Sequence, residues 1–201
     1  DILVSYLQEN SINAISPKNN LVENSSNTQV YYSYDTHWNQ LGAYIGVKDV
    51  LSTWDINIPD LSARNILKQP LNGNYHYGGE DDLAKMVGLL SLFDDEIEYS
   101  IEGTTSIDWE VYGEEQDSNI ISHIHNDNAS HMKTLFLVGD SFRTSMIPAL
   151  SEVFSDVYVV HRSYYKPDML ESIKPDYLIA EYIERYSYAI EDIGFLVDGN
   201  K

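Results

Sequence analysis

Residues 134–143 constrain the fold most, because an apolar run there stops at Gly-Asp-Ser and a helical pattern begins directly afterwards. A buried strand that turns into a helix presents Ser141 at the carboxyl end of a parallel strand, where α/β sheets bind ligands. The backbone N–H groups of Ser141 and Phe142 belong to the unpaired donors of a helix start, which can stabilise an oxyanion. Ser141 is therefore a candidate nucleophile. Gly-Asp-Ser is also an ordinary helix-capping sequence, so the serine needs a base elsewhere in the chain.

Strand and helix patterns alternate along the chain. Short apolar runs indicate strands at 29–34, 157–160 and 176–180, and 3.6-residue periodicity indicates helices at 41–54, 146–154 and 167–173. This alternation is typical of an α/β domain with a mostly parallel sheet. Residues 95–131 instead contain three short strand patterns with polar turns, which we interpret as a small β-rich insertion. The 201 residues fit one domain, 1–201.

The composition excludes several classes of protein. A net charge of −20 argues against binding nucleic acid or an anionic membrane surface, whereas a neutral or cationic partner is not repelled. The chain has no cysteine, which rules out disulfides and thiolate chemistry. It contains no run of 18 or more apolar residues and no glycine-rich phosphate loop, so we expect no transmembrane helix and no cofactor. The chain opens as if a helix were already under way, and we interpret it as part of a longer protein.

Asp35 and His37 are candidates for the base and its partner. A serine nucleophile needs a base to take its proton, and the base needs a carboxylate that fixes its tautomer and stabilises its charged form. The strand pattern at 29–34 runs directly into both residues, and a helix capped by Asn39 follows. If this strand and the one before Ser141 belong to one parallel sheet, all three side chains reach the same edge. The alternative is that Asp35 caps a helix and His37 is a half-buried structural residue.

Two sequence blocks resemble those of a known family. Tyr32–Asn39, which contains Asp-Thr-His-Trp and is followed by Gly-Ala-Tyr at 42–44, resembles the Asp-x-His-Trp block of SGNH-like polysaccharide O-acetyltransferases. This family includes the alginate O-acetylation proteins and the related DHHW proteins. Val138–Phe142 resembles the family's Gly-Asp-Ser-Phe block. Weaker matches follow in the same order at 80–86 and at 175–185, so the resemblance covers about residues 1–190.

The resemblance implies a three-layer SGNH-hydrolase-like (flavodoxin-like) fold. Ordinary GDSL esterases place the serine before the Asp-x-x-His, whereas here the Asp-x-His comes about a hundred residues earlier, as in the circularly permuted acetyltransferase branch. The family pattern assigns Ser141 as nucleophile, His37 as base and Asp35 as its orienting partner. It further implies an oxyanion role for Gly79. The segment at 79–83 is one residue longer than the family's Gly-Asp-Leu.

The resemblance also implies the setting of the protein. We expect an extracytoplasmic domain, secreted or at the cell surface and membrane-anchored through a segment outside this chain. Its acceptor is a polysaccharide, its acetyl donor is supplied by a membrane acyltransferase, and the domain is a monomer. Transfer of an acetyl group to a sugar hydroxyl is the first hypothesis. An acetyl esterase with the same triad is the second, and a non-catalytic carbohydrate-binding scaffold is the third.

Three further features have two interpretations each. Trp38 can stack on a sugar ring or pack beneath the His37 loop, and we favour packing. Arg143 can contact an acyl or sugar group or lie in solvent. His123, His125 and His131, with Asp127 nearby, suggest a metal site. Because zinc sites need three or four convergent ligands, we favour an exposed polar hairpin and expect no metal.

Overall fold

The structure, a computed structural model, describes residues 2–71, 82–89, 92, 95–104, 109–112 and 121–186. Contacts divide the chain into two compact units. The first contains Asp1–Thr105 and Thr144–Met146, and the second contains Ser106–Arg143 and Ile147–Lys201. Such units can belong to one domain, so the single catalytic domain stays a prediction. No helix among the described residues has the length and apolar character needed to cross a membrane.

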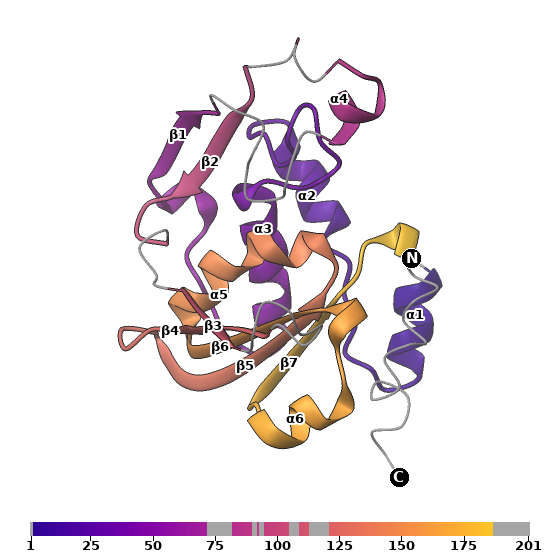
Figure 1. The fold of residues 1–201 in the computed structure, drawn as a ribbon, viewed down its shortest axis with the longest axis vertical. Coiled ribbons are helices and arrows are strands. Elements are labelled where there is room, and N and C mark those ends of the chain that lie inside the picture. Colours follow the sequence, from indigo (N-terminus) through magenta and orange to yellow (C-terminus); the bar gives the residue numbers. More distant parts are fainter. Residues whose placement is uncertain are drawn as a thin grey trace. The chain divides into compact units, whose positions relative to one another are not determined.

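The first unit is mainly helical (Figure 1). Its helices are α1 (Ile2–Glu9), α2 (Lys18–Ser25), α3 (Gln40–Ser52) and α4 (Asp82–Met86), with a 3₁₀ turn η1 (Leu61–Ala63). Two strands, β1 (Ile66–Pro70) and β2 (Ile97–Ile101), form a separate antiparallel pair. Helix α3 forms the centre of this unit, because all of its first eight residues, Gln40 to Val47, are buried. As predicted, Asn39 caps it: its side-chain oxygen accepts the N–H groups of Leu41 and Gly42 at 3.0 and 3.1 Å.

The strand predicted at 29–34 is wrong. Residues 29–34 fold back on the residues that follow them, through a single β-bridge between Tyr31 and Trp38. The alternation of the pattern still describes burial, because Val30 and Tyr32 are 4% and 3% exposed and Tyr31 is exposed. The alternation of apolar and polar residues predicted which side chains are buried, but it could not predict whether a neighbouring strand exists.

The second unit contains a five-stranded mixed sheet. The strand order is β3 (Trp109–Tyr112), β4 (Ile121–His125), β6 (Phe154–His161), β5 (His131–Gly139) and β7 (Tyr177–Glu181). Strand β5 pairs in parallel with β6 and β7, whereas β4 is antiparallel to both β6 and β3. The α/β class is therefore confirmed, but the sheet is mixed rather than mostly parallel.

Helices cover both faces of this sheet. In Figure 1, α5 (Ile147–Val153) and α6 (Pro167–Ile173) lie on opposite sides of it, which gives the predicted three layers within the second unit. Phe136 and Val138 pack with Met169 of α6, and alternation along β5 directs Leu135 and Leu137 to the other face. All four side chains of Leu135–Val138 are fully buried, as the uninterrupted apolar run predicted.

The predicted insertion at 95–131 is not one structural element. Strand β2 pairs with β1 in the first unit, whereas β3 and β4 form a hairpin that extends the main sheet beside β6. The division of this stretch between the two units was not predictable, because strand patterns do not identify the strands with which they pair.

Candidate functional site

Asp35 and His37 form a buried pair in the first unit. The Nδ1–H of His37 donates to Oδ1 of Asp35, and the backbone N–H of His37 donates to the same oxygen at 2.7 Å. The residues are 3% and 8% exposed. Because a carboxylate only accepts hydrogen bonds, Asp35 fixes the proton on Nδ1 and leaves the Nε2 lone pair as the basic atom of the ring. This is the tautomer that a general base needs.

Helix α4 holds Asp35 in place through a reciprocal pair of carboxylate contacts. Oδ2 of Asp35 accepts the N–H of Asp82 at 3.0 Å. In return, Asp82 accepts the Thr36 N–H at 2.7 Å and the Thr36 hydroxyl at 2.6 Å. The Tyr34 carbonyl accepts the N–H groups of Leu83 and Ala84, so the first donors of α4 are satisfied by the His37 loop. Asp82 in the first turn of α4 therefore holds the loop in place as well as interacting favourably with the helix dipole.

Glu96 supports the same loop, and the sequence analysis did not identify it. Its carboxylate is 3% exposed and accepts the N–H groups of Ser33 at 2.6 Å and Tyr34 at 3.1 Å. Tyr34 itself donates its hydroxyl to Asp95 at 2.7 Å. These contacts give residues 29–34 the hydrogen bonds that a neighbouring strand would otherwise supply. An acidic residue within an acidic stretch carries no sequence signal for this role.

Trp38 packs beneath the loop, as the favoured interpretation predicts. It is 6% exposed, and a Cβ at Gly46 of α3 would lie 3.1 Å from its six-membered ring. At Gly42 a Cβ would lie 2.2 Å from the Val30 carbonyl oxygen, so only glycine fits there. This explains the Gly-Ala-Tyr that follows the Asp-x-His-Trp block: the glycines let the loop approach the helix closely.

The premise of a shared sheet edge is wrong. Asp35 and His37 lie on a loop of the first unit, and Ser141 follows β5 of the second unit. The five-stranded sheet contains no strand from residues 29–34. Of the three residues, Ser141 alone follows a strand of this sheet.

Ser141 lies at the point where the order of the parallel strands reverses across the sheet. The chain passes from β5 to β6 on one side and then, through α6, to β7 on the other side of β5. Gly139 at the end of β5 is in register with His161 and Glu181, so the three strands end level. The carboxyl end of the central strand at such a switch point is the usual ligand-binding position in open α/β sheets. The helix after Ser141 starts as 3₁₀ η3 (Ser141–Met146), and Pro148 delays the α-helical part to Ile147, as predicted.

Asp140 shapes the nucleophile turn. Its Oδ1 accepts the Phe142 N–H at 3.0 Å, and its Oδ2 accepts the Ile183 N–H at 3.0 Å. These two bonds make Asp140 a turn-forming residue. The first bond occupies the Phe142 N–H that we predicted as an oxyanion donor, so an oxyanion there would compete with the Asp140 carboxylate. The Phe142 ring is 4% exposed and lies 5.9 Å from the Arg185 guanidinium.

A buried carboxyl group beneath the turn was also missed by the sequence analysis. Burial, together with the neighbouring Asp140, raises the pKa of Glu181 well above its ordinary 4.5. A Cβ at Gly139 would lie 2.7 Å from Oε2 and 2.8 Å from the backbone oxygen of Glu181. The glycine of Gly-Asp-Ser is thus required by its neighbour on β7. The family resemblance at 175–185 assigns no role to Glu181.

Arg143 braces the same turn. Its guanidinium donates to the Asp140 carbonyl at 2.5 Å, and burial lowers its pKa against the opposing charges of Glu181 and Asp140. Of the two interpretations of Arg143, the one in which its side chain lies in solvent does not hold, because the residue is partly buried. Gly79, the remaining predicted oxyanion residue, lies outside the described residues.

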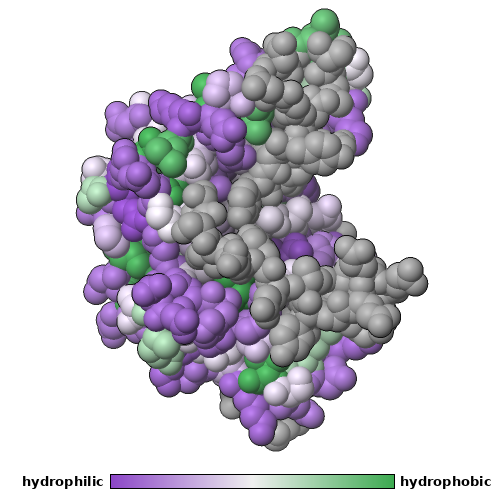
Figure 2. All heavy atoms as spheres, turned by 60° about the vertical axis from the view of Figure 1, so that its left-hand side comes forward, coloured by the Kyte–Doolittle hydropathy of each residue, from purple (hydrophilic) through white to green (hydrophobic). Residues whose placement is uncertain are grey.

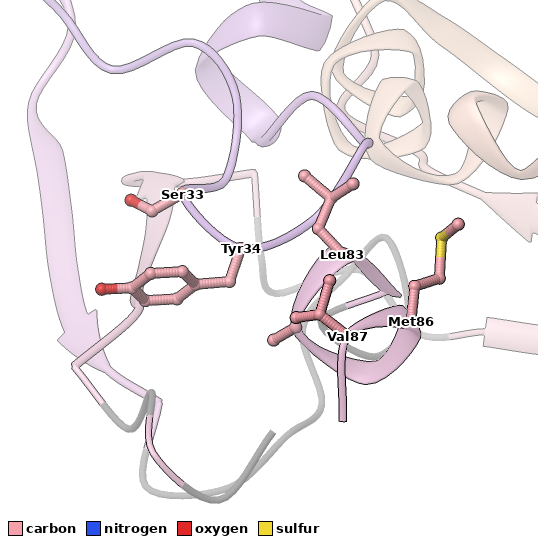
Figure 3. A pocket seen from close by; sticks show the side chains of 6 residues that line it. Ser33, Tyr34, Leu83, Met86 and Val87 are labelled. Carbon is pink, nitrogen blue, oxygen red and sulfur yellow. The ribbon is translucent and has the colours of Figure 1, made fainter. Parts of the chain in front are cut away.

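An open apolar pocket of about 310 Å³ borders the His37 loop. Figure 3 shows Tyr34 and Ser33 on one side of it and Leu83, Met86 and Val87 of the α4 region on the other. Tyr34 and Leu83 are the residues next to Asp35 and Asp82, so the clamp described above also shapes this pocket. An apolar wall with an aromatic ring suits the face of a sugar or an acyl chain.

Two groups of described side chains have the spacing of metal ligands. The first is Asp35, His37 and Asp82. Its four carboxylate oxygens already accept hydrogen bonds from His37, Thr36 and the Asp82 N–H, which explains the cluster without an ion. The second group is His123, His125 and Asp156 in the other unit.

The fold of this chain is similar to the folds of several solved proteins. It resembles a DHHW family protein from Eubacterium siraeum with a TM-score of 0.65 and 16% identity, covering 89% of this chain and 67% of that one. The resemblance predicted from the sequence blocks is therefore confirmed at the level of the fold. No protein-family model matches the sequence, and a search of curated proteins found no match.

Particular neighbours include Bacillus cereus PatB1, solved with a sulfonyl adduct. Its TM-score is 0.62 at 13% identity, with 91% of this chain and 72% of that chain covered. The O-acetyltransferase domain of Pseudomonas putida AlgJ also matches, at 14% identity over 98% of this chain and 70% of that one. Its TM-score of 0.49 is too low to support an argument.

Proposed function

We propose that the protein is a serine O-acetyltransferase that moves an acetyl group through an acyl-serine to a hydroxyl of an extracellular or cell-surface polysaccharide. The observation that carries the proposal is the Asp35–His37 pair, in which a buried carboxylate holds the Nδ1–H and leaves Nε2 as base. The position of Ser141 at the switch point of the sheet, the two sequence blocks and the fold shared with a DHHW family protein support it.

The proposed mechanism has two half-reactions. Nε2 of His37 takes the proton of Ser141 as its oxygen attacks the acetyl carbonyl, and the imidazolium then gives this proton to the leaving group of the donor. In the second half-reaction a sugar hydroxyl loses its proton to Nε2 and attacks the acetyl-serine. The imidazolium then gives this proton to the departing Ser141 oxygen, which restores both the serine and the base. Asp35 stabilises the imidazolium in both, because its carboxylate stays next to Nδ1.

The acceptor decides between the two enzymatic alternatives. Water in place of the sugar hydroxyl makes the same triad an acetyl esterase. The apolar pocket beside Tyr34 favours transfer, because an apolar wall with an aromatic side chain suits the face of a sugar ring. The family resemblance adds a membrane acyltransferase as donor and an extracytoplasmic location to the proposal.

Nitrophenyl acetate hydrolysis tests the triad. Ser141→Ala and His37→Ala are expected to lower kcat by about 10³-fold or more, and Asp35→Asn by a similar factor, because members of a triad act as a unit. Ser145→Ala is the matched control: it lies in the same 3₁₀ turn, and its buried hydroxyl has no hydrogen-bond partner in the described part of the chain. Full activity in Ser141→Ala, with the fold intact by circular dichroism, would contradict the proposal.

Two further measurements separate the alternatives. A sulfonyl fluoride is expected to react at Ser141, where an O–S bond forms and fluoride leaves, and peptide mass mapping locates the adduct. Incubation with an acetyl donor and a neutral oligosaccharide is expected to add acetyl mass to the oligosaccharide. Acetate release without any mass gain would favour the esterase, and failure of both reactions would favour the non-catalytic scaffold.

A further inference from the structure

A second cluster of histidine and carboxylate side chains lies on one face of the sheet in the second unit. His123 and His125 are two residues apart on β4 and therefore point to the same face of the sheet. Asp156 is the residue of β6 opposite His125. Nε2 of His123 and Nδ1 of His125 each lie 2.9 Å from Oδ1 of Asp156. Three ligand atoms of the kinds that zinc prefers therefore converge on one point.

The residues around the cluster hold each ligand in position. The second ring nitrogen of His125, Nε2, lies 3.0 Å from Asp127, and the Ser155 hydroxyl donates to Oδ2 of Asp156 at 3.0 Å. The His123 ring stacks on Tyr158 with a centroid separation of 4.2 Å. A histidine that directs one nitrogen inward and donates the other N–H to a carboxylate is the usual arrangement of a metal ligand. These contacts fix the orientation of the ligand side chains.

The distances and charges suit a divalent cation. A tetrahedral zinc with bonds of about 2.0–2.1 Å separates its ligand atoms by roughly 3.4 Å, so each 2.9 Å contact needs to lengthen by about half an ångström. Two neutral imidazoles and Asp156 leave one positive charge, which Asp127 balances. The side chains of His123, Asp156 and His125 are 13%, 28% and 49% exposed, which gives an ion a path from solvent.

We propose that His123, His125 and Asp156 form a zinc site that fastens β4 to β6, with water as the fourth ligand. In the described part of the sheet, the pairing of β4 with β6 joins the β3–β4 hairpin to the parallel strands. An ion held by both strands strengthens this junction, because it binds the folded protein and not the separated strands. No metal was expected from the sequence, because an exposed polar hairpin was the favoured explanation of His123, His125, His131 and Asp127, and zinc needs three or four convergent ligands. The sequence pattern could not identify Asp156, which is 31 residues from His125 and becomes its neighbour only in the sheet.

Calorimetric titration of the full chain, prepared without a polyhistidine tag and stripped with chelator, tests the site. Zinc chloride is expected to bind with a stoichiometry of about one. Zinc at about a hundred times its dissociation constant is expected to raise the melting temperature by about 5–10 °C. Magnesium is expected to cause no shift, because it prefers oxygen ligands.

Graded variants assign the binding to these residues. His125→Ala and Asp156→Asn are expected to weaken zinc binding by about 100-fold or more, and Asp127→Asn by about 10-fold, since it loses only the outer contact. His131→Ala, on the same sheet but outside the cluster, is the matched control and keeps wild-type affinity. His125 is half exposed, so its variant is expected to fold even if Asp156→Asn does not.

Three results would overturn the proposal. One is the absence of zinc binding to the stripped wild-type chain. Another is wild-type affinity in a folded His125→Ala variant. A third is loss of binding in His37→Ala with retention in His125→Ala, which would assign the ion to the other candidate group. None of these results depends on the enzymatic activity.

Discussion

At the scale of single residues, the carboxyl group of Glu181 packs against the turn that carries Ser141. It is enclosed, it lies against Gly139, and its Oε2 has no hydrogen-bond partner in the described part of the chain. The raised pKa indicates that the folded protein keeps the proton that the unfolded chain loses near pH 4.5. A neutral Glu181 can donate to the Asp140 carboxylate, which accepts two backbone N–H groups as well.

This state of Glu181 makes stability depend on pH. Because its folded pKa is above its unfolded pKa, its contribution is fully present below about pH 4.5 and is lost as the pH rises through the folded value. Over that interval the free energy of unfolding is expected to fall, relative to Glu181→Gln, by about 1.4 kcal/mol per pH unit. Urea unfolding of both proteins at several pH values between about 5 and 7 measures the difference. Parallel stability curves would mean that Glu181 is ionised in the folded protein, paired with Arg143.

At the scale of elements, the His37 loop is held by its neighbours rather than by a sheet. Helix α4 contributes Asp82, and the segment before β2 contributes Glu96, which accepts two N–H groups of the loop. Tyr34 is the second of these donors and directly precedes Asp35. Displacing the segment at Tyr34 therefore displaces the carboxylate that orients His37.

Replacing Glu96 tests this dependence. Glu96→Ala leaves the Ser33 and Tyr34 N–H groups without their acceptor, which is expected to cost about 1–3 kcal/mol of unfolding free energy. Nitrophenyl acetate hydrolysis is expected to fall further than the unfolded fraction explains, and Glu96→Gln to recover much of it. Glu102→Ala is the control, because the Glu102 carboxylate is exposed and accepts a hydrogen bond from the Asn65 side chain. Its expected change in unfolding free energy is within about 0.5 kcal/mol. Equal effects of Glu96→Ala and Glu102→Ala on activity would contradict the role of Glu96.

The same elements show how far sequence patterns reach. The apolar run before Ser141, the cap at Asn39 and the delay at Pro148 were predictable, because each depends on a few consecutive residues. The Asp35–His37 contact was predictable for the same reason, since the residues are two apart. Glu96 and Glu181 were not, because their partners are more than 40 residues away and become neighbours only through tertiary packing.

At the scale of the whole molecule, the charge is the dominant property. The chain has 32 acidic and 12 basic side chains, and hydrophilic residues predominate over hydrophobic ones on the face in Figure 2. A net charge of −20 repels anionic polymers over a distance set by the salt concentration. The Debye length is about 30 Å at 0.01 M salt and about 8 Å at 0.15 M, so this repulsion is strong only at low salt.

This charge predicts which acceptors the proposed transferase uses at low salt. Acetyl transfer to a neutral oligosaccharide is expected to change little between about 0.01 and 0.15 M salt, whereas transfer to an anionic oligosaccharide of equal length is expected to rise. Initial rates by mass spectrometry measure both, and hydrolysis of neutral nitrophenyl acetate across the same salt range shows whether salt alters the catalytic groups themselves. Faster transfer to the anionic acceptor at low salt would contradict the prediction, because it would require a local cationic surface whose attraction exceeds the repulsion of the net charge.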